Sequence, residues 1–216
     1  MVHVAVGWVW ARLPFFVPKR EQELDPLLRW LGFDGWGFHQ GFFHWPDYVA
    51  AQSWPRRLRS AKTGTLWKAS SAARENPAGT LSTESPYETR AFDQGLGRSF
   101  WFVNGGNPAW IERTIRSFPE ERQRDLWSGI GLAAVYAGGV EELSLKELLT
   151  MADRFRPELA QGACFATKAR EQAGNLTDYT EMASQALCGM SAIEAARLTD
   201  STLENLPASG SGSEPA

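Results

Sequence analysis

Glycine recurs in four similar apolar stretches of this chain, and this recurrence restricts the possible folds more than any other feature. The stretches are DGWGFHQGFF (34–43), DQGLGRSFWFV (93–103), WSGIGLAAVYA (127–137) and AQGACFATKA (160–169). Their first aligned glycines are Gly35, Gly95, Gly129 and Gly162, separated by 60, 34 and 33 residues. Taking about 26 residues of a polar insertion out of the first interval leaves a period near 34 throughout, which is typical of helix–turn–helix repeats.

Ordinary amphipathic segments, such as PAWIERTIRSF and LSLKELLTMADRF, lie between the glycine-rich stretches. Few windows show the two-residue alternation of a strand. The sequence therefore predicts an all-α fold of stacked helical hairpins, in which glycine-rich inner helices alternate with amphipathic outer helices. The aromatic and alanine positions of the tetratricopeptide consensus do not recur.

Several helix starts can be read directly from local capping patterns. Asn107 followed by Pro108 predicts a cap and a first helical residue. Serine followed three residues later by glutamate, a capping box, predicts further starts. These pairs are Ser117 with Glu120, Ser144 with Glu147, and Ser191 with Glu194.

Glycine inside a helix costs about 1 kcal/mol relative to alanine, so its recurrence needs a reason. Two interpretations remain open. The missing Cβ allows a neighbouring helix backbone to approach closely, or it leaves a groove in which an apolar ligand lies along the helices.

The domain organisation follows from composition along the chain. Residues 1–206 are expected to form a single all-helical domain, interrupted by a polar, mobile insertion at 53–85 that is rich in Lys and Arg. Residues 207–216 are expected to be a disordered tail.

Bulk composition excludes several classes of protein. A net charge of −3 gives no reason to expect nucleic-acid binding. The longest uncharged run, residues 127–140, is shorter than the about 20 apolar residues that a transmembrane helix needs. The N-terminus lacks the basic and small-residue pattern of a signal peptide, and the two cysteines form no CxxC pair. A cytoplasmic protein is expected.

Motifs for cofactor or metal chemistry are also missing from the sequence. No phosphate-binding GxxxxGK[ST] loop and no GxSxG nucleophile motif occurs. His39 and His44 are five residues apart, whereas a zinc-binding helix places two histidines four apart. We therefore expect no metal and no cofactor.

A candidate pocket is nevertheless defined by polar and aromatic residues within the glycine-rich stretches. A polar residue precedes each aligned glycine, namely Asp34, Gln94, Ser128 and Gln161. These residues form either a ladder of hydrogen bonds between helices or a polar stripe along a groove. Arg98 is a candidate residue for binding a carboxylate or phosphate group. The whole candidate set comprises Asp34, Trp36, His39, Gln40, His44, Asp93, Gln94, Arg98, Trp101, Trp127, Ser128, Tyr136, Gln161 and Lys168.

Five motifs together resemble a known family. They are MVHVAVGWVWARLP, DPLLRWLGFDGWGFHQGFFHW, RAFDQGLGRSFWFV, DLWSGIGLAAVYAGGV and LAQGACFATKAREQAGN. In this order they are similar to the family called domain of unknown function 1702, over about residues 2–206 apart from the insertion. Members are often described as enediyne biosynthesis proteins, because some are encoded beside enediyne polyketide synthases.

The resemblance implies a bacterial accessory protein of antibiotic or other secondary metabolism, acting on an enediyne or polyene polyketide. It carries over no catalytic residue, so whether the protein is an enzyme stays open. The chain departs from the family by an expected loss of N-terminal sequence, by the insertion, and by Gln40 where an acidic residue is expected.

Three functions follow as alternatives. The first is binding or modification of a long apolar polyketide intermediate in a groove lined by Trp36, Phe38, Phe42, Trp101, Trp127 and Tyr136. The second is a non-enzymatic helical-repeat scaffold for a polyketide synthase or a carrier protein. The third is a truncated, inactive family member.

Overall fold

The structure is a computed structural model that describes residues 2–13, 24–25, 28–53 and 86–204. Its regular elements are all helical, which confirms the predicted all-α class for this part of the chain. The helices are α1 (Val2–Arg12), α3 (Trp30–Ser53), α6 (Pro86–Val103), α7 (Pro108–Arg116), α8 (Glu120–Ala137), α9 (Glu142–Ala152), the short 3₁₀ helix η4 (Asp153–Phe155), α10 (Arg156–Gln172), α11 (Asp178–Cys188) and α12 (Ala192–Leu203). The predicted insertion from residue 54 onward and the predicted tail lie outside the described residues.

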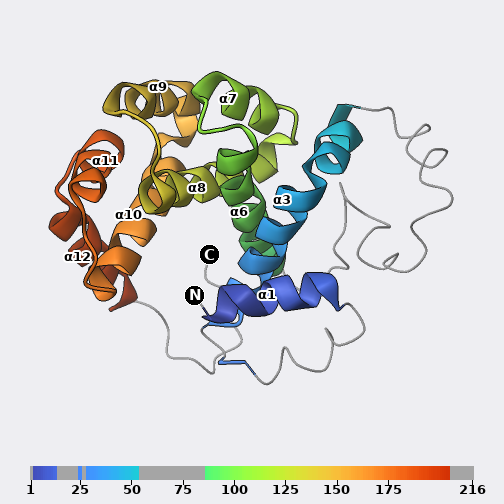
Figure 1. Cartoon of the computed structure of the whole chain (residues 1–216), viewed down its shortest axis with the longest axis horizontal. Coiled ribbons are helices and arrows are strands. Elements are labelled where there is room, and N and C mark those ends of the chain that lie inside the picture. The colour runs from blue at the N-terminus through green and yellow to red at the C-terminus, as the bar shows by residue number, and fades with distance from the viewer. Residues whose placement is uncertain (1, 14–23, 26–27, 54–85, 205–216) are drawn as a thin grey trace, which may run out of the picture.

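The glycine-bearing helices are neighbours in space as well as in order. Figure 1 shows α1, α3, α6, α8 and α10 following one another along a curve, with α7, α9 and α11 on its outer side. Successive members of this series make the most extensive helix–helix packing of the molecule, first α1 on α3, then α3 on α6, α6 on α8 and α8 on α10.

The aligned glycines lie where these helices touch. A Cβ atom on Gly95 would collide with the carbonyl oxygen of Asp34, one on Gly129 with that of Gln94, and one on Gly162 with that of Ser128. In each case the carbonyl belongs to the residue just before the aligned glycine of the preceding helix. The backbones are therefore too close to admit any side chain larger than hydrogen.

A second glycine, two residues later, makes the corresponding contact with the following helix. A Cβ on Gly37 would meet the carbonyl of Phe92, one on Gly97 that of Leu126, and one on Gly131 that of Leu159. At each crossing, a glycine from each of the two helices thus allows the two backbones to come into close contact.

The N-terminal helix α1 makes the same contacts, although its sequence was not aligned with the others. A Cβ on Gly35 would collide with the carbonyl of Val4, and one on Gly7 with the carbonyl of Gly32. Ala5 stands at the position that an aligned glycine occupies elsewhere. The signal was missed because α1 lacks the first, aligned glycine and keeps only the second, Gly7.

The outer helices cover the main hydrophobic core. Leu96 and Phe100 of α6 meet Ile111 and Ile115 of α7 in one continuous cluster that also includes Leu148 of α9. All five side chains are fully buried. A smaller cluster of Trp10, Phe33 and Ala91 joins α1, α3 and α6.

The helix starts confirm two of the predicted caps and correct two others. Asn107 accepts a hydrogen bond from the Trp110 backbone N–H at 3.0 Å, and Ser191 and Glu194 form the predicted capping box. The boxes at Ser117 and Ser144 were wrong. The extended Pro119 precedes α8, and α9 already starts at Glu142, which places Ser144 inside the helix.

No helix in the described part of the chain is long and apolar enough to cross a membrane.

Candidate functional site

An exposed cluster of aromatic rings, contributed by three successive helices, is the most distinctive feature of the surface. Its members, called the aromatic surface below, are Trp8, Phe38, Phe42, Phe43 and Phe102. Trp8 lies 5.5 Å from Phe38 between ring centroids, and Phe102 lies 5.6 Å from Phe38 and 6.0 Å from Phe42. Phe42, Phe43 and Phe102 remain 39%, 46% and 42% exposed.

Helical spacing explains why these rings gather on one side. Phe38 and Phe42 are four residues apart on α3, and Arg98 and Phe102 are four apart on α6, so each pair lies on one helix face. Phe42 and Phe102 are 60 residues apart, as are Gly35 and Gly95. The glycine contacts at the crossing therefore bring equivalent positions of neighbouring helices into contact.

A buried ion pair lies next to this surface. Arg98 Nη2 of α6 is 2.6 Å from Asp34 Oδ1 of α3, and both side chains are less than a tenth exposed. The Arg98 guanidinium carbon lies 4.4 Å from the centroid of the Phe38 ring. Burial raises the pKa of Asp34 above its ordinary value, and the charge of Arg98 opposes that rise.

The second buried aspartate of the candidate set, Asp93, has a different partner. Arg122 of α8 donates from Nε to Asp93 Oδ2 at 2.8 Å and from Nη2 to Oδ1 at 2.5 Å. Burial raises the pKa of Asp93, and the hydrogen bonds from Arg122 oppose the rise. This bidentate pair ties α6 to α8 on the side where Phe118 packs, and Arg122 lies 5.3 Å from that ring.

The polar residues before the aligned glycines do not all meet. Gln94 Nε2 donates to Ser128 Oγ at 3.2 Å, which joins α6 to α8. Asp34 pairs with Arg98 instead of Gln94. Gln161 is exposed on α10. The hydrogen-bonded ladder is therefore present at one helix crossing, and an ion pair stands at the crossing before it.

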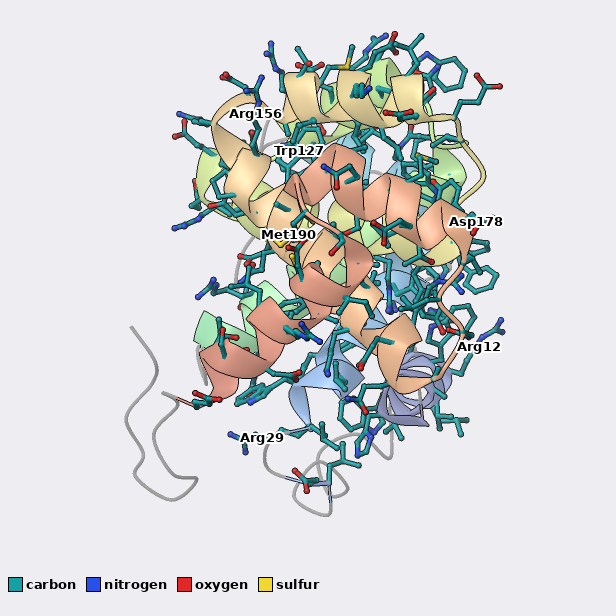
Figure 2. The ribbon with its side chains drawn as sticks, turned by 90° about the vertical axis from the view of Figure 1, so that its left-hand side faces the viewer. Arg12, Arg29, Trp127, Arg156, Asp178 and Met190 are labelled. Carbon is teal, nitrogen blue, oxygen red and sulfur yellow. The ribbon has the colours of Figure 1, made fainter. Side chains whose placement is uncertain are left out.

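His39 lies on the other flank of the aromatic surface, facing α1. Arg12 donates from Nε to His39 Nε2 at 3.2 Å, and Trp8 packs against the imidazole at 5.3 Å between ring centroids. Figure 2 shows Arg12, the last residue of α1, at the edge of the molecule. Burial, with smaller contributions from Arg12 and His44, lowers the pKa of His39 to about 4. His39 is therefore neutral at pH 7 and accepts a hydrogen bond there.

The remaining histidine of the candidate set, His44, marks a bend. Its backbone leaves the helical conformation (φ −129°, ψ 18°), two residues before Pro46, and its ring lies 6.1 Å from that of His39. Proline removes a helical hydrogen bond and clashes with the preceding turn, which explains the kink. Gln40 is half-buried one residue after His39.

The tryptophans of the candidate set face away from the aromatic surface. Trp101 and Trp127 belong to the main core, and the Trp101 indole N–H donates to the Gly138 carbonyl at 3.2 Å. Trp127 lies in the interior in Figure 2. Trp36 packs against Phe92 at 5.8 Å.

Tyr136 and Lys168 make polar contacts at the C-terminal half of the helix series. Arg170 Nη2 donates to the Tyr136 carbonyl at 2.5 Å, and its guanidinium lies 5.0 Å from the Tyr136 ring. Lys168 Nζ donates to Glu171 at 3.0 Å and to Asp200 at 2.8 Å. Lys168 thus joins α10 to α12, and these hydrogen bonds raise its pKa.

The two cysteines, which form no CxxC pair in sequence, lie against each other in the structure. Cys164 of α10 and Cys188 of α11 are free thiols with 3.6 Å between their sulfur atoms. The hydrogen bond between the two thiols lowers the pKa of Cys164 to about 7.

Two cavities among the described residues lie away from the aromatic surface. One, of about 370 Å³, is open to solvent between α9 and α11 and is lined by Glu142, Asp178, Glu181, Met182 and Gln185. The other, of about 270 Å³, lies between α7, α8 and η4 and is bordered by Trp127. Within the described ranges, no three His, Cys, Asp or Glu side chains gather closely enough to hold a metal ion.

Fold and surface together define an all-helical protein that presents an aromatic surface next to a buried Asp–Arg pair. A family model described as "Protein of unknown function (DUF1702)" matches residues 1–216, so the chain belongs to this family. A search of curated proteins found no match, and neither did a search of solved structures.

Sequence reasoning missed Trp8, Phe43 and Phe102 of the aromatic surface, and the arginines Arg12 and Arg122. Phe102 was detectable, because it stands as far after Gly95 as Phe42 stands after Gly35. Trp8 required the alignment of α1 with the other helices. The two arginines gave no signal, because each acts on a residue more than 25 positions away.

Proposed function

We propose that this protein is an accessory protein of secondary-metabolite biosynthesis that binds a long, apolar, conjugated polyketide chain on the aromatic surface. The observation that carries the proposal is a contiguous set of rings from α1, α3 and α6, of which Phe42, Phe43 and Phe102 are exposed. The resemblance to enediyne-associated proteins supports the pathway class and a bacterial setting, and a cytoplasmic location is part of the proposal.

Aromatic faces suit a flat conjugated chain. Edge-to-face and offset contacts between π-systems contribute about 0.5–1.5 kcal/mol each beyond burial of area. Contiguous exposed apolar patches on soluble proteins mark ligand or partner sites more often than isolated apolar residues do. Backbone atoms fill the helix crossings at the aligned glycines. The polyketide chain is therefore proposed to lie along the surface of the helices instead of between them.

The proposed architecture is a stack of helical hairpins with the glycine-rich helices on the inside. Its support is the recurrence of the same two glycine-to-carbonyl contacts at successive crossings, from α1 on α3 to α8 on α10. Such a stack places equivalent side chains in rows along one face. The aromatic surface would be part of these rows.

A helical-repeat scaffold for a polyketide synthase or carrier protein is the second candidate. It is favoured by large apolar side chains on the outer helices, since Trp110 of α7 is 64% exposed and Leu143 of α9 is 68% exposed. A protein partner would use these outer positions, whereas the polyketide chain would use the aromatic surface.

The test is a fluorescence titration of the purified protein with 1,6-diphenylhexatriene, an apolar conjugated probe. The double substitution Phe42→Ser with Phe102→Ser removes two exposed rings and is expected to weaken binding about tenfold or more, since each buried aromatic side chain contributes on the order of 1–3 kcal/mol. Trp110→Ser, an exposed aromatic substitution on α7, serves as the matched control and should leave the affinity unchanged. Equal binding by the double variant and wild type would exclude the aromatic surface as the site.

A further inference from the structure

The buried pair of Asp34 and Arg98 is incompletely satisfied. Although Arg98 Nη2 lies 2.6 Å from Asp34 Oδ1, the angles do not form a hydrogen bond, and no other partner replaces it. Both Asp34 carboxylate oxygens and the Arg98 Nε and Nη2 atoms therefore have no hydrogen bond among the described residues. An unsatisfied buried polar group destabilises the folded protein, and a charged one does so more strongly.

The neighbouring buried pair shows that this is not a general property of the fold. Asp93 and Arg122 form two hydrogen bonds, at 2.8 and 2.5 Å, with the bidentate geometry that the guanidinium favours. At the next crossing, Gln94 and Ser128 also satisfy each other. Four of the nine unsatisfied buried side-chain atoms in the described part of the chain belong to Asp34 and Arg98, and the others lie on Arg29, Trp36, His39, Glu158 and Arg170.

The Arg98 guanidinium is directed at that surface. Its central carbon lies 4.4 Å from the centroid of Phe38, whose ring is in contact with Trp8, Phe42 and Phe102. Arg98 is 7% exposed, so its polar atoms lie just below the rings. A small shift of the Phe38 ring would bring an oxygen atom of a ligand bound on it within reach of the Arg98 N–H groups that make no hydrogen bond.

The charges of Asp34 and Arg98 determine which kind of ligand oxygen can bind beside them. Burial raises the pKa of Asp34, but arginine stays protonated in proteins and a buried guanidinium without a counter-charge is very costly, so the charge of Arg98 holds Asp34 in its ionised form. The pair as a whole is then uncharged. A ligand carboxylate would be repelled by Asp34, whereas the oxygen of a ketone, ester or thioester would accept from Arg98 without that repulsion.

We propose that Arg98, oriented by Asp34, is the hydrogen-bond anchor for an uncharged carbonyl group on an apolar conjugated chain held by the aromatic surface. The inference rests on the proposed function, because it assumes that the aromatic surface binds such a chain. It adds the chemical class of the ligand, an ester-, thioester- or ketone-bearing polyene instead of a free acid or a hydrocarbon.

Three probes of similar shape separate these classes at pH 8. They are trans-parinaric acid, which is a conjugated carboxylate, its methyl ester, and 1,6-diphenylhexatriene, which has no oxygen. We expect wild type to bind the ester about tenfold more tightly than the acid. Arg98→Met should weaken ester binding about 10-fold or more, in line with the loss of a hydrogen bond to a charged donor, and should leave diphenylhexatriene binding within about twofold.

Asp34→Asn gives a reversal that a purely structural pair would not produce. With the carboxylate removed, Arg98 keeps an uncompensated positive charge, and the preference should change from the ester to the acid. Asp93→Asn is the matched control, because it makes the same change in the other buried pair of α6. It should change thermal stability without changing the ratio of ester to acid affinity.

The outcomes separate the two proposals. If no probe binds wild type, the proposed function and the anchor both fail. If diphenylhexatriene binds and the Phe42 and Phe102 substitutions weaken it, but the ester has no advantage over the acid, the anchor alone is overturned. If the Arg98 and Asp34 variants do not fold, the absence of an ester advantage over the acid in wild type still overturns the anchor.

Discussion

At the scale of single residues, Gly129 sets the distance between two helices. An added Cβ would collide with the carbonyl oxygen of Gln94 and come within 2.5 Å of the Arg98 backbone nitrogen. Both obstacles are backbone atoms of α6, which cannot move aside as a flexible side chain does. The same residue is predicted by sequence as an aligned glycine, so pattern and packing agree here.

Gly129→Leu is therefore expected to prevent cooperative folding, and Gly129→Ala to lower the free energy of unfolding by about 1–3 kcal/mol, the usual cost of overpacking. Urea unfolding monitored by circular dichroism measures both. Glu147→Leu, at an exposed position of α9, introduces the same side chain and should change stability by less than about 0.5 kcal/mol. An unchanged midpoint for Gly129→Leu would contradict the close approach of α6 and α8.

His39 shows how burial, with smaller contributions from neighbouring charges, changes the pKa of a residue. With a pKa lowered to about 4, below the ordinary value of 6.5, the folded protein binds fewer protons at this site than the unfolded chain does. The stabilising contribution of neutral His39 is fully present above pH 6.5 and is lost as the pH falls toward 4.

The pH dependence of stability should accordingly be flatter between pH 6.5 and 4 in His39→Gln than in wild type. The glutamine side-chain oxygen is able to accept from Arg12 but does not titrate. Urea denaturation at half-unit steps of pH provides the comparison, with His3→Gln as the control for a histidine that is partly exposed. Parallel curves for His39→Gln and wild type would mean that His39 titrates normally.

At the scale of elements, the Ser–Glu capping pattern marks the start of α12 but not that of α9. Ser191 caps α12 because its side chain accepts from the Glu194 backbone N–H and the glutamate returns a hydrogen bond. Ser144 has the same spacing to Glu147, yet α9 starts two residues before it. Thr177 and Thr180 form a capping box that the Ser–Glu pattern did not include.

This difference predicts unequal effects of the same substitution. Ser191→Ala should destabilise the protein by about 1 kcal/mol through the loss of the cap. Ser144→Ala should have little effect or stabilise α9 slightly, since alanine is the better helix former inside a helix. Thermal melts of the two variants decide the matter, and equal losses would contradict the assigned start of α9.

At the scale of the whole molecule, the helices differ in how many neighbours hold them. α8 packs against α6, α10, α7 and α11, whereas α1 packs mainly on α3, through the glycine contacts and the cluster around Trp10. Elements with fewer packed partners open at a lower free energy than the core does. The aromatic surface is thus built partly on a helix that has one main packing partner among the described helices.

Amide hydrogen exchange should reveal this gradient. We expect the amides of α8 to exchange only through global unfolding and those of α1 to exchange at least about tenfold faster through local opening. A ligand bound on the aromatic surface should slow exchange in α1, because Trp8 would then be held by contacts from both α3 and the ligand. Uniform protection across α1 and α8 would show that the molecule opens only as one unit.

The sequence by itself determined the helical class, several helix starts and the glycines at the crossings. These features depend on short-range physics: periodicity, caps, and the absence of a side chain at regular intervals. The aligned spacing even predicts which positions of α3 and α6 are equivalent, although the predicted repeat was not extended to α1.

Only the tertiary structure decided which charges pair and which rings meet. Asp34 and Asp93 look alike in sequence, yet Asp34 faces an arginine with poor hydrogen-bond geometry and Asp93 binds one in bidentate fashion. Phe42 and Trp127 are both aromatic residues of glycine-rich helices, and one is exposed while the other is buried in the core. Such outcomes depend on helix rotation and crossing geometry, which place residues far apart in the chain within a few ångströms, and no local pattern encodes that meeting.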